Sequence, residues 1–229
     1  MKMFRTACVT AAMVASLPSV AATINYGGVP ASGGGFTTAL TGPGVTTETF
    51  NGTTGNCGVT TGITVTGNYH LVIGSQAGYY AAPAGDTTCY MSIPQNGSNG
   101  IATVAPLSLI TPNKKLTYFG LYWGSIDNYN SIEFYNNNTL VTTVTGAQAL
   151  AANAVPGNQT SGGSNRYVNI YFSPSEIVNK IKFVSSGRAF ELDNVAFKTV
   201  ATPEPASLAL FGGALLAGAA LRRRRRKSA

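Results

Sequence analysis

The 229-residue chain is poor in charged side chains, which make up 10% of it, and histidine occurs once, as His70. Few charges beside many Thr, Asn, Gly and aromatic residues favour strands and turns over helices. No catalytic triad can be assembled around His70, because no serine or cysteine nucleophile stands in a recognisable setting. Glycoside hydrolysis would need two opposed carboxylates about 5–10 Å apart, and nothing in the sequence marks such a pair. We therefore expect no enzymatic activity.

The N-terminus has the order of a secretory signal peptide. Lys2 and Arg5 precede an uncharged stretch, residues 6–17, which is too short to span a bilayer comfortably. The small residues Val20-Ala21-Ala22 follow, and signal peptidase accepts only small side chains before its cut. We therefore expect signal peptidase to remove residues 1–22 during export.

The C-terminus combines a proline motif, an apolar stretch and a basic tail. Pro203-Glu204-Pro205 precedes residues 206–221, which as a helix would span roughly 24 Å, somewhat less than the roughly 30 Å hydrocarbon core of a bilayer. The tail, residues 222–227, begins with Arg222, Arg223 and Arg224. It should stay on the cytoplasmic side, because positive residues that flank a span resist translocation.

These three parts, in this order, resemble the PEP-CTERM sorting signal of exosortase-processed Gram-negative surface proteins. The resemblance implies recognition by an integral-membrane exosortase, cleavage near Pro203-Glu204-Pro205, and delivery to the cell surface or extracellular matrix after transient anchoring in the inner membrane. A permanent inner-membrane anchor is the alternative, because the topology of the span would be the same. Residues 201–229 would then form the sorting signal, and residues 23–200 the surface domain.

The basic character of the chain resides in its two ends. The formal net charge is +7, but only seven of the fifteen lysines and arginines lie between Thr23 and Pro203, where seven acidic residues balance them. A polyphosphate partner needs a surplus of positive charge to release counterions. We therefore expect no nucleic-acid partner for the mature domain.

Cysteine is also scarce, and Cys8 would leave with the signal peptide. Outside the cytoplasm the remaining pair, Cys57 and Cys89, is expected to form a disulfide, with two separate buried thiols as the alternative. Two cysteines and His70 cannot complete a tetrahedral metal site without unusual helpers.

Short strand-like runs separated by Gly, Pro and Asn turns fill the mature chain after a glycine-rich lead-in, which would form an irregular first edge at most. The expected strands are residues 45–50, 62–66, 69–73, 88–93, 101–104, 115–123, 131–135, 140–144, 166–172, 180–184 and 189–197, with one short helix at 147–152. The run 115–123 carries apolar bulk on both faces, as in a central strand covered on both sides or one whose outer face binds a ligand. The pattern predicts an all-β fold, an antiparallel β-sandwich or jelly roll.

Three segments of the domain carry a second resemblance. Residues 79–88, 118–130 and 190–197 resemble segments common in exosortase-dependent surface proteins, and the last is similar to the closing strand of carbohydrate-binding β-sandwiches. The resemblance supports the fold and brings no established activity.

One strand-to-loop transition is the strongest candidate for a ligand site. It holds Tyr122, Trp123, Asp127, Asn128 and Tyr129. Aromatic faces stack on sugar rings, and Asp and Asn form directional hydrogen bonds to hydroxyls. The alternative is that the only tryptophan packs in the core.

Two acidic residues are candidates for a metal site. Glu191 and Asp193 are two apart on an expected strand, so their side chains should point to the same face. Together with Asp86 or Asp127 they could hold calcium through oxygen ligands. A solvated strand edge is the plainer alternative, and we expect no other cofactor.

The combined expectation is an exported, non-catalytic surface or matrix protein whose β-sandwich binds exopolysaccharide in a biofilm. A structural coat component without a ligand site is the alternative, followed by a secreted glycoside hydrolase.

Overall fold

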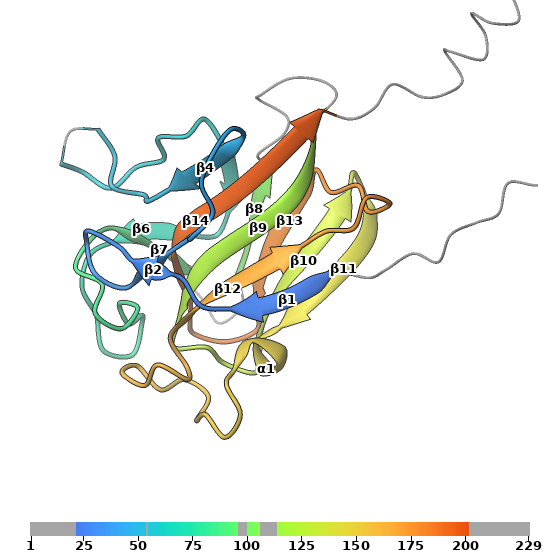
Figure 1. Cartoon of the computed structure of the whole chain (residues 1–229). Helices are drawn as coiled ribbons and strands as arrows, with labels where there is room; N and C mark the ends of the chain where they lie inside the picture. The colour runs from blue at the N-terminus through green and yellow to red at the C-terminus, as the bar shows by residue number, and fades with distance from the viewer. Residues whose placement is uncertain (1–21, 54, 96–99, 106–113, 202–229) are drawn as a thin grey trace, which may run out of the picture.

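A computed structural model describes residues 22–53, 55–95, 100–105 and 114–201. The expected signal peptide, apart from Ala22, and the chain from residue 202 onward lie outside these residues. Within them two antiparallel sheets lie face to face, with a short helix at one end (Figure 1). The all-β antiparallel sandwich predicted from the spacing of strands and turns is thereby confirmed.

The larger sheet has seven strands in the order β1-β12-β9-β14-β7-β6, with β4 beside β14. Their bounds are β1 Thr23–Tyr26, β12 Arg166–Tyr171, β9 Lys114–Gly124, β14 Phe190–Ala201, β7 Tyr90–Ile93, β6 His70–Val72 and β4 Val45–Glu48. The smaller sheet comprises β11 Thr139–Thr145, β10 Asn130–Asn136, β13 Lys180–Ser185, β8 Gly100–Ala105 and β5 Thr64–Gly67. A short pair consists of β2 Val29–Pro30 and β3 Phe36–Thr37, and α1 spans Gly146–Ala149.

The strand pattern in the sequence agrees closely with these elements. Each expected run overlaps an observed strand, and α1 overlaps the predicted helix. The glycine-rich lead-in contributes the edge strand β1, which pairs with β12 from Thr23 to Tyr26. Short β-rich runs bounded by turn residues were therefore sufficient to place the strands from β4 onward, whereas the short pair β2 and β3 was not predicted.

The central strand β9 is buried on both of its faces. Phe119, Leu121 and Trp123 belong to the core cluster between the sheets, and none of the three has exposed surface. Trp123 stacks on Phe190 with ring centroids 4.4 Å apart and planes 5° apart. Tyr122, on the opposite face, is also buried. Of the two predicted roles for this strand, the one observed is a central strand covered on both sides.

The outer face of the larger sheet is covered by glycine-rich backbone. At Gly34, where φ is +91°, a Cβ atom would lie 1.8 Å from the carbonyl oxygen of Gly85. At Gly35 it would lie 2.4 Å from the ring of Tyr122. The Thr87 N–H also donates to the carbonyl of Gly33 over 3.0 Å. Only glycine permits this close approach and this left-handed backbone. The glycine run therefore allows the lead-in to lie directly against the sheet.

A buried carboxylate organises the loop that follows β4. Glu48 has no exposed surface, and one of its oxygens accepts hydrogen bonds from the N–H groups of Thr60 at 2.7 Å and Thr61 at 2.9 Å. Its other oxygen accepts from the Phe50 N–H at 2.8 Å, and the Thr61 hydroxyl adds a further bond of 2.8 Å. A buried carboxylate is tolerated when donors surround it in this way.

The expected disulfide joins Cys57, in the loop after β4, to Cys89, directly before β7, across a sequence separation of 32 residues. Replacing both cysteines by serine is expected to lower the free energy of unfolding by about 3–4 kcal/mol, because the unfolded chain regains the entropy of an open loop. Chemical denaturation of the oxidised protein measures the difference. Reductant should destabilise the wild type and leave the double variant unchanged; equal stability of oxidised and reduced wild type would contradict the prediction.

Candidate functional site

A pocket of about 480 Å³ opens at the end of the sandwich where β9 ends and β14 begins. Antiparallel pairing places Gly124, the last residue of β9, opposite Glu191 near the start of β14. The pocket is lined by parts of four segments, residues 75–81, 125–127, 157–159 and 188–191. Segments far apart in the sequence therefore meet there because two neighbouring strands turn at the same edge of the sheet.

Glu191 lies in the pocket lining and is 2% exposed. One carboxyl oxygen accepts a hydrogen bond from the Ala81 N–H at 2.9 Å, and the other accepts from the Ser125 hydroxyl at 2.8 Å. Burial raises the pKa of Glu191 to about 7, and the charge of Asp127 adds to the shift. The two bonds fix the carboxyl group while it remains part of the pocket wall.

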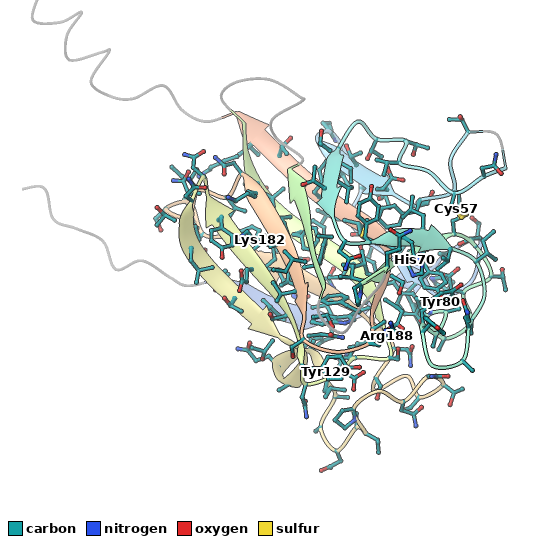
Figure 2. All side chains as sticks on the ribbon, turned by 180° about the vertical axis from the view of Figure 1, so that it is seen from behind. Cys57, His70, Tyr80, Tyr129, Lys182 and Arg188 are labelled. Carbon is teal, nitrogen blue, oxygen red and sulfur yellow. A yellow bond between two sulfur atoms is a disulfide. The ribbon has the colours of Figure 1, made fainter. Side chains whose placement is uncertain are left out.

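An aromatic ring and a guanidinium group stand at the rim. Tyr79 is 46% exposed, and the Arg188 guanidinium lies 4.6 Å from the centre of its ring. Arg188 also donates to the carbonyl of Gly78 over 3.4 Å. The Tyr129 hydroxyl donates to the backbone carbonyl of Arg188. Figure 2 shows Arg188 between Tyr129 and Tyr80 in the lower half of the molecule, with Lys182 above them.

The second carboxyl group of the pocket belongs to Asp127. Burial raises its pKa, and a hydrogen-bonding interaction with Tyr129 opposes the shift. Asn165 holds the neighbouring wall, because its side-chain oxygen accepts from the N–H groups of Ser125 at 2.9 Å and Ala84 at 3.1 Å. The pocket thus offers carboxyl acceptors, a guanidinium donor and a partly exposed aromatic ring. This combination suits a small ligand rich in hydroxyl groups.

The predicted ligand residues divide between the core and the pocket. Trp123 and Tyr122 are buried, and the Tyr122 hydroxyl donates to the carbonyl of Ala84 at 2.6 Å. Core packing, the alternative stated for Trp123, is the one observed, and the expectation that the two residues stack on a ligand is corrected because both faces of β9 are covered. Asp127 lines the pocket and Tyr129 borders it through its bond to Arg188. Asn128 is exposed and is not among the lining residues.

The two residues predicted to bind a metal, Glu191 and Asp193, lie on the same face of the sheet but have different neighbours. Glu191 and Asp193 both lie opposite Leu192, which belongs to the core cluster. The solvated edge proposed as the alternative is wrong, since the two are 2% and 0% exposed. Glu191 faces the pocket, whereas Asp193 faces Asp86. Throughout the described part of the chain, no three His, Cys, Asp or Glu side chains gather as a metal site.

The carboxyl group of Asp193 is strongly perturbed. Burial raises its pKa to about 9, and the negative charge of Asp86 adds to the effect. The pKa of Asp86 is also raised by burial, although bonds from Thr88 oppose that shift. Two acids that face each other without solvent cannot both ionise cheaply unless something positive joins them.

Several pocket residues were missed by reasoning from sequence. Arg188 is one of only seven basic residues in the mature domain, and it lies three residues before Glu191. The scarcity of basic residues and the short spacing between Arg188 and Glu191 were the signals in the sequence that could have pointed to Arg188. Tyr79 offered a weaker one, because it opens a segment that resembles other surface proteins. Ser125 and the loop 157–159 carry no local signal, since their place follows from long-range folding.

Comparison with known proteins bears on the C-terminal end of the chain. The model of the PEP-CTERM protein-sorting motif matches residues 201–226 of the chain. No curated protein and no solved structure matches the chain. The matched residues lie almost wholly beyond the described part, as do Pro203, Glu204, Pro205 and the arginines from 222 to 224. Within the described part, no helix is long and apolar enough to cross a membrane.

Proposed function

Because the chain is a PEP-CTERM sorting-motif protein, we propose that its sandwich is displayed outside the cell as a non-catalytic module that binds a neutral sugar unit of an exopolysaccharide. The motif supports export and recognition by an exosortase. On this proposal signal peptidase removes residues 1–22 and the exosortase cleaves near Pro203-Glu204-Pro205. The membrane holds residues 206–221 only until that cut, and the released protein then joins the extracellular matrix of a biofilm.

One observation carries the binding proposal: the exposed Tyr79 ring stands at the rim of a pocket whose buried carboxyl group, Glu191, is held in place. A sugar ring presents an apolar face to an aromatic side chain and hydroxyls to the polar groups around it. Arg188 supplies donors there, while Asp127 supplies an acceptor. One guanidinium beside two carboxyl groups gives no surplus of positive charge, which favours a neutral sugar over an acidic one.

The same geometry favours binding over hydrolysis. Both oxygens of Glu191 already accept hydrogen bonds, from Ala81 and Ser125. A general acid has to deliver its proton to the glycosidic oxygen, and a carboxyl group fixed on both oxygens is poorly placed for that step. The hypothesis that the protein is a glycoside hydrolase is therefore the less favoured alternative.

Substitution at the pocket rim tests the proposal. Arg188→Ala and Tyr79→Ala should each weaken retention on purified exopolysaccharide from the producing strain by about tenfold, because each removes one charge-assisted bond or one stacking surface. Binding is measured by affinity electrophoresis or calorimetry, and folding by circular dichroism.

Tyr135→Ala is the matched control. Tyr135 also carries a cation over its ring, with the Lys182 ammonium 4.5 Å away, but it lies on the smaller sheet. Its replacement should leave retention unchanged. If the wild type is not retained at all, the coat-component alternative replaces the proposal. Release of reducing sugars from the polysaccharide would instead favour a hydrolase.

A further inference from the structure

A pair of buried carboxyl groups lies on the outer face of the larger sheet, apart from the sugar pocket. Asp193 on β14 has no exposed surface, and no backbone N–H or hydroxyl group among the described residues donates to either of its oxygens with normal geometry. Asp86, in the loop before β7, is 7% exposed. Its Oδ1 atom accepts from the N–H and hydroxyl of Thr88, both at 2.8 Å, and its Oδ2 atom has no partner. The two carboxyl groups lie within hydrogen-bonding reach of each other, so either a shared proton or a bound cation has to join them.

The comparison with Glu48 shows how unusual this pair is within the same domain. Glu48 is equally buried on the neighbouring strand β4, and N–H and hydroxyl donors satisfy both of its oxygens. For Asp193, the N–H of Asn194 lies nearby without forming a hydrogen bond of normal geometry. A carboxylate left without donors costs several times more to bury than one that is satisfied.

The hydroxyl groups around the pair are committed elsewhere. The Tyr122 hydroxyl donates to the Ala84 carbonyl at 2.6 Å, and the Tyr167 hydroxyl donates to the Asn194 carbonyl at 3.1 Å. The Tyr90 hydroxyl donates to the Gly74 carbonyl at 2.6 Å. Among the described residues, no lysine or arginine is a main influence on the carboxyl groups of Asp86 and Asp193. Apart from a proton shared within the pair, no described residue therefore gives a hydrogen bond of normal geometry to three of the four oxygens.

We propose that Asp86 and Asp193 together bind a divalent cation of the calcium type. Unpaired carboxylate oxygens are the ligands that a hard cation prefers, and neither cysteine nor histidine belongs to the pair. Asp193 is fixed on a central strand, whereas Asp86 belongs to a loop that packs on the glycine-rich lead-in at Gly34. A bound ion would therefore fasten the loop and the lead-in to the sheet. This inference is independent of sugar binding.

Calcium titration of chelator-treated, surface-released protein tests the proposal. Calorimetry should show one site per chain. At a calcium concentration 100-fold above Kd, the midpoint of thermal unfolding should rise by about 5–10 °C, because the ion binds the folded state alone. Magnesium at the same concentration should have a clearly smaller effect, since it accepts only near-ideal octahedral geometry.

Two near-isosteric variants localise the site. Asp193→Asn and Asp86→Asn should each abolish the calcium-induced rise, whereas Glu133→Gln on the smaller sheet should preserve it. A rise that survives in both aspartate variants would overturn the assignment, because the ion would then bind elsewhere. The proposal also fails if calcium neither binds the wild type nor stabilises it. In that case, an Asp193→Asn variant at least as stable as the wild type would indicate that the two acids share a proton.

Discussion

Replacing Trp123 by alanine is expected to lower the free energy of unfolding by about 3–5 kcal/mol, the usual cost of deleting a large buried aromatic side chain. Trp123 has no exposed surface and stacks on Phe190, which in turn meets the ring of Phe183 on the smaller sheet at 5.6 Å. The substitution would leave a cavity at the contact between the two sheets. Chemical denaturation followed by tyrosine fluorescence or circular dichroism measures the loss.

Trp123→Phe is the matched control for this prediction. The indole Nε1–H has no acceptor among the described residues, so a phenyl ring loses no hydrogen bond and keeps most of the stacking. We expect it to cost less than half as much as alanine and to leave sugar retention unchanged. An alanine variant within about 1 kcal/mol of the wild type would be typical of an exposed site and would contradict the burial of Trp123.

The strands could be predicted from sequence because their signal is local. Turn residues bound each run, and alternation shows which side chains share a face. The same alternation could not show that the second face of β9 is also covered. That cover comes from the lead-in, whose Gly35 lies against Tyr122 although the two are far apart in the chain. Core packing of Trp123 was one of two alternatives that the sequence left open, and both Tyr122 and Trp123 lie inside.

The candidate site shows the same division between local and long-range information. Spacing along β14 predicted that Glu191 and Asp193 share a face, and they do. It could not predict that one would border a pocket and the other would meet Asp86, because loops distant in sequence decide this. Arg188, which donates to Gly78 across 110 residues, illustrates the difficulty. A single sequence gives the direction of a side chain more readily than its neighbours.

Replacing Pro203, Glu204 and Pro205 by alanine is expected to abolish release of the protein to the cell surface almost completely. The triplet lies within the sorting motif that matches residues 201–226. Without a cut there, residues 206–221 and the basic tail should hold the chain in the inner membrane, because the tail resists translocation. Intact-mass measurement of the surface-released and membrane fractions distinguishes cut from uncut chains, and wild-type protein should end near Pro203.

Substituting lysine for Arg222, Arg223 and Arg224 provides the control for membrane orientation. Lysine preserves the positive flank, so the chain should still insert with its tail in the cytoplasm. Loss of release in the alanine variant while the lysine variant remains membrane-inserted would assign the defect to the proline motif rather than to topology. A surface-released wild-type species that keeps residues 222–227 would refute the proposed cleavage and favour a different route to the surface.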